Sequence, residues 1–444
     1  MYVAVKGGEQ AIAAAHALLH EERRGPGDIP DLSLDQIGHQ LKFAVDRVMA
    51  EASLYNPRLA ALAIKQAAGD LQEAVFLLRA YRTTLPRFVP SLPVNTDRMR
   101  ISRRISATWK DLPGGQILGS TFDYTHRLLD RTLIAGTETD TAAAGRTQAG
   151  ADRTQAQAGH EDAASPAASA VAPDWQADGH LAPIPPVMPR AALALEQDGL
   201  LERSWSVAGP DAQAANEASD PCSLQKACQD IPDITRDPLE LPCNRPEDRP
   251  LRLQMLARSD EGFLLAMAYS TQRGFGAVHP FTSELRRGFV EVSLIPEELD
   301  FPVVLGELEL TECITISRYT GTACEPCFTQ GYGLAFGNNE RKAISMSIVD
   351  RALRAHEMEE EETGPGQNPE FVLLHGDSVD ASGFVQHIKL PHYVDFQAEL
   401  SLIRELRGRK KEHKETDPDE PNAETGNGTG TVPGNGTGSV EDAR

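Results

Sequence analysis

The feature that most constrains the fold is a long stretch, residues 135–250, that separates two blocks with regular apolar patterns. Residues 136–190 consist mainly of Ala, Gly, Thr, Gln, Asp and Pro, a composition typical of disordered segments. A structureless loop of this length does not fit inside one compact domain unless it is a linker or a surface insertion. We therefore expect a long disordered insertion between two folded blocks, with short local structure around residues 191–200.

The first block, residues 1–134, has the signals of consecutive amphipathic helices. Ser33 and Gln36 form a capping box, and Asn56 followed by Pro57 is a favoured way to begin a helix. Asp70 is the N-cap expected for a further helix. A single helix is expected to carry the apolar positions Leu34, Ile37, Leu41, Val45 and Val48. These patterns predict a helical N-terminal unit.

The second block, residues 251–408, contains rows of alternating apolar and polar residues, as half-buried strands do. Val290 and Val292 belong to one row, and Leu308 and Leu310 belong to another. A helix is expected after residue 339, and a last helix precedes a disordered acidic tail over 409–444. The predicted fold class is mixed α and β, with a helical N-terminal unit and an α/β C-terminal block that contains a sheet.

The net charge is −22, from 43 Lys and Arg against 65 Asp and Glu, which disfavours binding to nucleic acid or to an anionic membrane surface. Much of this charge lies in the insertion, in the run EMEEEE at 357–362 and in the tail, so the folded blocks can still hold a basic pocket. No apolar run reaches the ~18–20 residues of a membrane span. The first residues lack the pattern of a secretory signal, so we expect a cytoplasmic protein.

Six basic residues, most of them beside glycines or at an expected helix start, are candidates for binding a triphosphate, because guanidinium and ammonium groups pair with phosphate oxygens. The alternative is an ordinary solvated basic face. A phosphate-loop signature is missing, since the glycine spacing at 114–119 is followed by Ser120 rather than by lysine. The six candidates are Arg103, Arg104, Lys110, Arg273, Arg341 and Lys342.

Glu312 is the carboxylate that the strand pattern singles out. If the strand through Leu308 and Leu310 continues to Ile316 without a bulge, Glu312 lies on the apolar face and Cys313 on the other. Burial raises the pKa of a carboxyl group and suits it to act as an acid or to stabilise charge at a site. The alternative is that the strand ends at residue 311 and Glu312 turns to solvent.

Two pairs of residues have side chains that bind metals in other proteins. His387 and His392 are separated by Pro391, which prevents one uninterrupted helix from carrying both, and together they supply half of a zinc site. Ordinary surface or core histidines are the alternative. Cys324 and Cys327 form a lone C-x-x-C, which is more typical of reduced thiols in a loop than of a zinc or redox site.

Several phrases of the sequence together resemble one protein family. They are MYVAVKGGEQAI, LAALAIKQAAGD, FLLRAYRTTLPR, DLPGGQILGSTFDYTHRLLD, EGFLLAMAYSTQRGFG, GYGLAFGNNERKA and HIKLPHYVDFQAEL. This set resembles the PhnI family, the nucleosidase-like subunits of the bacterial carbon-phosphorus lyase core complex. The resemblance covers residues 1–134 and 251–407, which are the two folded blocks.

The resemblance implies an enzyme subunit of phosphonate utilisation, active with partners, that displaces adenine from MgATP with an alkylphosphonate and forms a ribose 1-alkylphosphonate 5-triphosphate. It implies that His387 and His392 bind a zinc ion shared with the radical S-adenosylmethionine lyase, and that magnesium arrives with ATP. Two small subunits and ATP-binding-cassette-type proteins are the further partners implied. Because the ribose ring gains positive charge as the glycosidic bond breaks, Glu312 and Asp377 are candidate catalytic carboxylates, by analogy with glycoside hydrolysis.

Two other functions remain open from the sequence. A non-catalytic scaffold would dock the radical lyase through the shared zinc site and leave the chemistry to other subunits. A zinc hydrolase would need a complete metal site within this one chain.

Overall fold

The computed structural model describes residues 8–112, 114–122, 128–129, 131, 133, 188–202, 233–235, 241–273, 279–299, 301–389 and 393–416. The chain divides into two units, one formed by Met1–Ala15 with Gly383–Arg444 and the other by His16–Ser382. The sheet and the helices that cover it lie in the second unit. Most of the predicted insertion at 135–250, together with His392 and residues 417–444 of the predicted tail, lies outside the described residues.

A four-stranded antiparallel sheet, in the order β1-β2-β3-β4, is the centre of the second unit. Its strands are β1 (Arg100–Ile105), β2 (Phe281–Leu294), β3 (Val303–Tyr319) and β4 (Cys327–Phe336). The mixed α and β class and the strands predicted around residues 290 and 308 are confirmed. Strand β1 pairs with β2, so the sequence boundary drawn at residue 134 is not a break in the fold: the first block supplies an edge strand to the sheet of the second.

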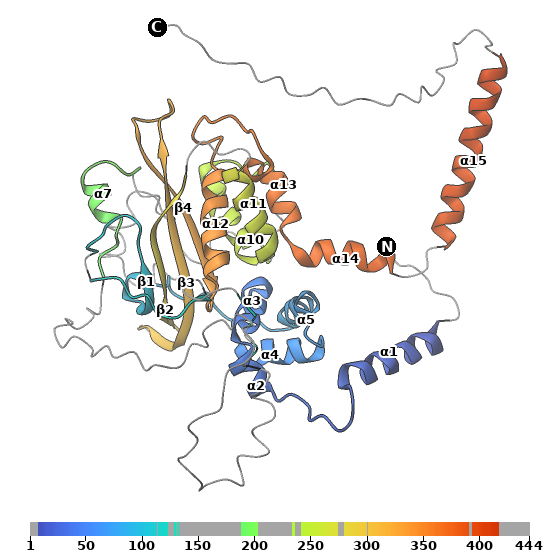
Figure 1. The fold of residues 1–444 in the computed structure, drawn as a ribbon, viewed down its shortest axis with the longest axis horizontal. Coiled ribbons are helices and arrows are strands. Elements are labelled where there is room, and N and C mark those ends of the chain that lie inside the picture. The colour runs from blue at the N-terminus through green and yellow to red at the C-terminus, as the bar shows by residue number, and fades with distance from the viewer. Residues whose placement is uncertain are drawn as a thin grey trace, which may run out of the picture. The chain divides into compact units, whose positions relative to one another are not determined.

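Helices cover one face of the sheet. They are α10 (Arg249–Arg258), α11 (Glu261–Arg273) and α12 (Glu340–Ala352), and α12 packs directly on β3 and β4 (Figure 1). Two glycines of β4 make this close packing possible. A Cβ atom at Gly331 would lie 1.8 Å from the Ser347 carbonyl oxygen, and one at Gly333 would lie 2.0 Å from that of Ala343. The helix backbone therefore rests directly on the strand backbone.

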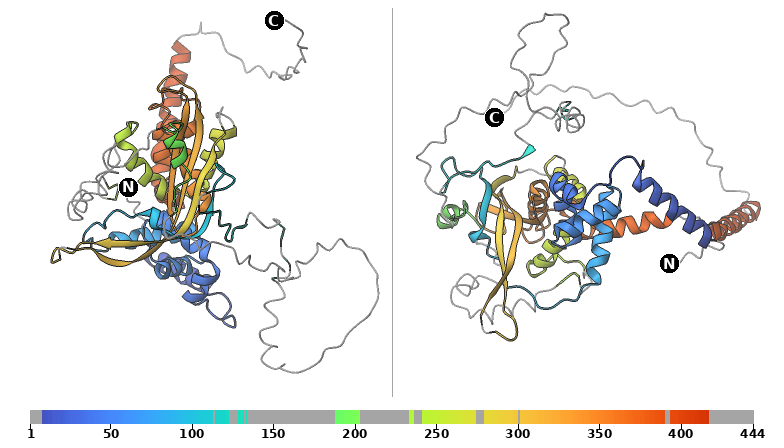
Figure 2. Two further views of the ribbon diagram at one scale, coloured as in Figure 1. Left: turned by 90° about the vertical axis from the view of Figure 1, so that its left-hand side faces the viewer. Right: turned by 90° about the horizontal axis from the view of Figure 1, so that it is seen from below.

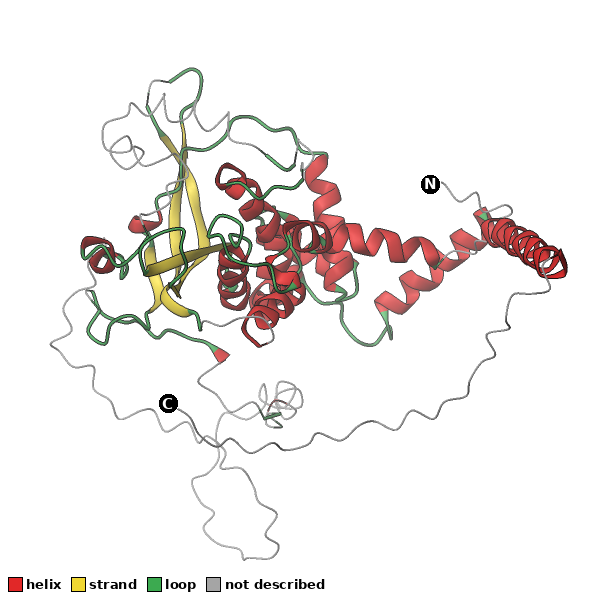
Figure 3. Cartoon of the chain, turned by 90° about the horizontal axis from the view of Figure 1, so that it is seen from above, coloured by secondary structure: helices red, strands yellow, loops and turns green. Residues whose placement is uncertain are grey.

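The opposite face of the sheet is covered by short elements and loops, as the green segments beside the yellow strands in Figure 3 show. The 3-10 helix η1 (Thr96–Arg98) lies on this side, as does the segment 188–202, which contains α7 (Leu193–Gln197). In Figure 1, α7 and α12 lie on opposite sides of the strands. The short local structure predicted at 191–200 is thus confirmed, and it packs on the sheet through Leu195, Leu201 and Ile316.

The helical N-terminal unit is confirmed as a small bundle of α2 (Leu34–Gln40), α3 (Lys42–Ala52), α4 (Pro57–Gln66) and α5 (Leu71–Thr83), seen from below in Figure 2. Ser33, Asn56 and Asp70 cap α2, α4 and α5 as predicted. The prediction of one helix through residues 34–48 is wrong. At Leu41 the backbone leaves helical geometry (φ −113°, ψ 35°), so α2 and α3 are separate helices that each pack on α4.

The remaining described elements are α1 (Glu9–Arg24), η4 (Pro246–Asp248), η5 (Pro365–Gln367), α13 (Pro369–His375), α14 (Ser378–Ile388) and α15 (Tyr393–Thr416). The predicted last helix is therefore confirmed, but it continues past residue 409, where the tail was expected to begin. No helix in the described part of the chain is both long and apolar enough to span a membrane.

Candidate functional site

Glu312 lies in the middle of β3, where the strand pattern places it. Residues 310–319 of β3 pair with β4 in unbroken register, with Glu312 opposite Arg286 on β2 and Leu334 on β4. The β2–β3 pairing is irregular at Ser283 of β2, opposite residues 314 and 315, which adds no residue to β3. The bulge that the prediction allowed for occurs earlier, at Leu305, and does not change this part of the strand. The Glu312 residue is 2% exposed and faces away from α12, while Cys313 packs against that helix. The predicted burial of Glu312 is confirmed.

Three donors hold one oxygen of the Glu312 carboxylate. Its Oε1 accepts hydrogen bonds from the Thr96 hydroxyl (2.9 Å), the Tyr332 hydroxyl (2.9 Å) and Arg190 Nη2 (3.4 Å). Among the residues that the structure describes, none donates to Oε2, although this atom is buried. Buried polar atoms without a partner are uncommon in folded proteins, and they occur where a site uses them. We call these four residues the Glu312 cluster.

The electrostatics of the Glu312 cluster keep its donors protonated. Burial, followed by the negative charge of Glu312, raises the pKa of Tyr332 well above its ordinary value. Burial opposes the charge of Arg190, but the carboxylates of Glu312 and Asp97 outweigh it and raise the pKa of that guanidinium. Tyr332 is therefore a neutral donor and Arg190 a permanent cation beside the carboxylate.

A second buried carboxylate, Glu284, lies on the same face and is fully used by internal contacts. It pairs with Arg104 Nε (2.7 Å) and Arg286 Nε (2.9 Å), and its Oε2 accepts from the backbone N–H of Ala191 (3.1 Å). Arg104 also donates to the Pro189 carbonyl (2.7 Å). These bonds fix the segment 188–202 over the sheet, beside the Glu312 cluster.

The structure does not gather the six predicted phosphate-binding residues into one place. Arg104 is held by Glu284, Arg103 by Glu340 (2.7 Å), and the exposed Arg341 by Glu261 (2.8 Å). Lys342 is fully buried and donates to the Ser259 carbonyl (2.6 Å). Of the remaining two, Lys110 is exposed and Arg273 is exposed with a hydrogen bond to the Tyr269 hydroxyl (3.2 Å).

Asp377 is clamped between two arginines. Arg79 Nη1 reaches both carboxylate oxygens (2.5 and 2.7 Å), and Arg258 Nη2 lies 2.6 Å from Oδ2. The carboxylate also accepts from the backbone N–H of Val379 at the start of α14 (3.0 Å). Burial opposes ionisation, but the two guanidinium groups outweigh it and lower the pKa of Asp377. None of these partners contacts Glu312, so the structure does not bring the two candidate carboxylates together.

The predicted metal ligands are only partly described. His387 lies in the last turn of α14, with its ring 5.0 Å from that of Phe384, whereas His392 lies outside the described residues. Cys324 and Cys327 are free thiols in the β3–β4 hairpin with their sulfur atoms 3.6 Å apart. The described part of the chain contains no group of three or more His, Cys, Asp or Glu residues suited to hold a metal ion.

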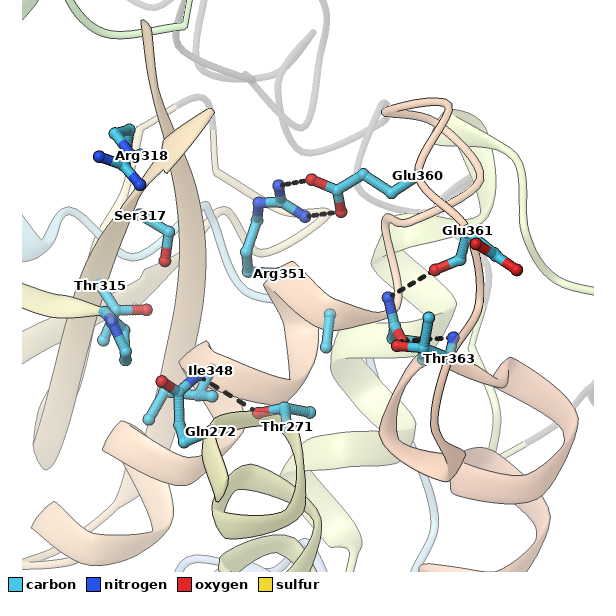
Figure 4. A pocket seen from close by; sticks show the side chains of 13 residues that line it. Thr271, Gln272, Thr315, Ser317, Arg318, Ile348, Arg351, Glu360, Glu361 and Thr363 are labelled. Atoms are coloured by element: carbon cyan, nitrogen blue, oxygen red, sulfur yellow. Dashed lines mark hydrogen bonds and ion pairs between the residues drawn. The ribbon is translucent and has the colours of Figure 1, made fainter. Parts of the chain in front are cut away.

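The sequence analysis missed most of the Glu312 cluster. Tyr332 could have been found, because strand alternation puts it on the same face as Leu334 and Phe336. Arg190 and Thr96 carry no such signal, since each reaches Glu312 across more than a hundred residues of sequence. A pocket lined by Ser317 of β3 and Arg351 of α12 was also missed (Figure 4).

Comparisons with known proteins agree on one family. Residues 1–410 match the family described as "Bacterial phosphonate metabolism protein (PhnI)". A protein of Rhizobium meliloti is 50% identical over 408 residues, covering 92% of this chain and 95% of its own length. A protein of Escherichia coli is 49% identical over 412 residues, covering 92% of this chain and 98% of its own. Both relatives are named "Alpha-D-ribose 1-methylphosphonate 5-triphosphate synthase subunit PhnI".

Proposed function

This chain belongs to the PhnI family of bacterial phosphonate metabolism proteins, and from that premise we propose that it displaces adenine from MgATP with an alkylphosphonate, as a subunit of the carbon-phosphorus lyase core complex. The product is a ribose 1-alkylphosphonate 5-triphosphate. The observation that carries the proposal is the similarity over 92% of the chain to two proteins named as subunits of such a synthase. We place the protein in the cytoplasm with its partners.

The proposed reaction exchanges one bond at ribose C1′ for another. A phosphonate oxygen forms a bond to C1′ while the C1′–N9 bond breaks, and adenine leaves with the electron pair and takes up a proton. Positive charge builds on the ribose ring before the new bond is complete. A fixed anion that faces this charge stabilises the transition state more than the ground state.

We assign that role to Glu312. Its Oε1 is held by Thr96, Tyr332 and Arg190, so the carboxylate is oriented before substrate arrives, and its buried Oε2 has no donor among the described residues. In a site shielded from water such a charge acts more strongly than in solution. Glu312 is 2% exposed, so a substrate that contacts Oε2 requires a movement of the residues packed around it.

Two exposed cations suit the triphosphate. Lys110 and Arg273 are the members of the predicted basic set that are exposed and that form no ion pair with a carboxylate among the residues that the structure describes. Arg103, Arg104, Arg341 and Lys342 would have to exchange internal partners before they could bind phosphate. The sequence analysis made Asp377 a candidate catalytic carboxylate, but its ion pairs with Arg79 and Arg258 favour a structural role, which a direct test must separate from catalysis.

We also propose that His387 and His392 bind a zinc ion at the contact with the radical S-adenosylmethionine lyase. The imidazole of His387 fits, because it lies at the end of α14, half-buried beside the Phe384 ring. A bound zinc would supply a fixed bridge between the subunits, with the remaining ligands from the partner. Two small subunits and ATP-binding-cassette-type proteins complete the proposed assembly. A His387→Ala/His392→Ala chain should assemble without zinc and lose the lyase, and normal zinc content would contradict this.

Release of free purine base tests the proposed reaction. The purified chain, alone and with its partner subunits, is incubated with MgATP or MgGTP, with and without methylphosphonate, and the base is separated by chromatography. Adenine released with the phosphonate, together with a ribose 1-methylphosphonate 5-triphosphate, is the expected result. No base under any combination would contradict the proposal.

One observation favours a non-catalytic scaffold as the second candidate: most predicted phosphate-binding residues are used in internal contacts. On that reading the chain holds the other subunits, and a Glu312→Gln chain would support base release by the assembled complex at the normal rate.

A further inference from the structure

A pocket of about 310 Å³ lies on the helix-covered face of the sheet, and the Glu312 cluster lies on the other face. Gln272 at the end of α11, Ser317 on β3 and Arg351 on α12 contribute to its walls, and the segment around residues 360–367 closes one side (Figure 4). Thr315 and Ser317 differ from Glu312 in strand parity, so they point to the opposite face of the sheet. The pocket is therefore a separate site.

Arg351 presents a guanidinium fork in this pocket. Its Nε donates to the Thr329 hydroxyl of β4 (2.5 Å), which sets the plane of the group. Its two terminal nitrogens bind the two carboxylate oxygens of Glu360 (3.0 and 2.7 Å), as Figure 4 shows. The Arg351 side chain is 11% exposed and that of Glu360 is 34% exposed. The cation is thus anchored in the wall, and the carboxylate occupies its more exposed side.

A phosphate or phosphonate group fits this fork in the same two-point geometry that Glu360 adopts. Such an oxyanion carries up to two negative charges where a carboxylate carries one, so it can replace the carboxylate on the guanidinium. Glu360 belongs to the acidic run 359–362, and its departure into solvent leaves Arg351 held by Thr329.

The rest of the pocket suits a hydroxylated ligand. The hydroxyl-bearing residues Thr315, Ser317 and Thr363 and the amide-bearing Gln272 all contribute to its lining. A volume of about 310 Å³ is more than a lone oxyanion fills and is at the small end of the range for small-molecule sites. Hydroxyls and amides donate and accept hydrogen bonds with sugar hydroxyls.

We propose that this pocket binds a phosphorylated sugar, with the phosphate on Arg351 in place of the Glu360 carboxylate and the sugar hydroxyls against Ser317, Thr315 and Gln272. Glu360 competes with the ligand for the guanidinium and so lowers its affinity. The site is independent of the chemistry proposed at Glu312.

Binding to the full-length chain, measured by titration calorimetry, tests this site with ribose 5-phosphate, glucose 6-phosphate, inorganic phosphate and unphosphorylated ribose. The sugar phosphates should bind more tightly than phosphate, and ribose should not bind. Arg351→Gln should weaken binding by about tenfold or more, because it removes a two-point charged contact. Glu360→Gln should tighten binding several-fold.

Glu362→Gln is the matched control for Glu360→Gln, because it makes the same change of charge in the same exposed run outside the pocket lining. The proposal is overturned if no sugar phosphate binds, if phosphate binds as tightly as the sugar phosphates, or if Glu360→Gln tightens binding no more than Glu362→Gln. If Arg351→Gln does not fold, the comparison of Glu360→Gln with Glu362→Gln still tests the proposal.

Discussion

Replacing Asp377 by asparagine separates a structural role of this residue from a catalytic one. The carboxylate is 1% exposed and neutralises both Arg79 and Arg258, at distances of 2.5 and 2.6 Å. Asparagine keeps the shape but removes the charge, and its amide group points a donor at guanidinium donors. The buried Arg79 and the partly buried Arg258 then lose their common anion, and Val379 loses a charged acceptor at the start of α14.

The expected cost follows from the burial of this ion pair. Removing one partner of a buried pair costs about 3–5 kcal/mol, because the other charge stays desolvated and unpaired. Against a total of about 5–15 kcal/mol for an ordinary domain, that is a large fraction of the stability. The loss should depend on pH. The folded pKa of Asp377 is lowered below 3.8, so its stabilisation is present above that pH and disappears as the pH falls through the folded pKa.

Urea unfolding at pH 7, followed by circular dichroism and by tryptophan fluorescence, measures this cost where the two transitions coincide. Asp380→Asn is the matched control, because Asp380 is exposed in the first turn of the same helix and should cost less than about 1 kcal/mol. Adenine release by Asp377→Asn should fall only in proportion to the folded fraction. Unchanged stability with abolished adenine release would refute the reasoning and return Asp377 to catalysis.

Three further predictions concern packing and charge in the second unit. Burial lowers the pKa of Lys342 to about 8, so between pH 8 and 10.5 the unfolded chain binds a proton that the folded chain does not. The free energy of unfolding of the wild type should therefore rise by up to about 3 kcal/mol relative to that of Lys342→Met over this range. Urea midpoints of the wild type that are equal at pH 7.5 and pH 10 would exclude this dependence. Gly331→Ala should destabilise the folded chain by about 3 kcal/mol or more, since the new Cβ would meet the Ser347 carbonyl oxygen. An unchanged melting temperature would argue against the close packing of α12 on β4. Glu359 has φ 53°, so Glu359→Gly should stabilise by about 0.5–1 kcal/mol in a thermal melt, and a loss of stability would contradict this.

The parts of the fold that depend on residues close together in the sequence could be predicted from the sequence. The caps at Ser33, Asn56 and Asp70 are local hydrogen bonds, and the burial of Glu312 follows from the alternation of one strand. The break at Leu41 could not be predicted, because it arises from the packing of two helices on a third. Strand β1 was missed since its sequence, RISRRI, is rich in arginine.

The same buried arginines that made β1 hard to predict also explain why the candidate functional site was predicted only in part. Arg103 and Arg104 are buried because Glu340 and Glu284 neutralise them, and those partners lie more than a hundred residues away. A basic residue paired in this way looks in the sequence like a free phosphate ligand. Only the three-dimensional arrangement shows which cations are already used and which, such as Lys110, are exposed.

The most direct test of the account is a single-turnover measurement of adenine and ribose 1-methylphosphonate 5-triphosphate by the assembled complex that carries a Glu312→Gln chain. Glu307→Gln, on the same strand with a more exposed side chain, is the control. Loss of a fixed charge that faces the transition state should slow the Glu312→Gln complex by about 10²–10³-fold, measured per folded and assembled complex. Adenine formed at the rate of the Glu307→Gln control would contradict the assignment of the chemistry to Glu312.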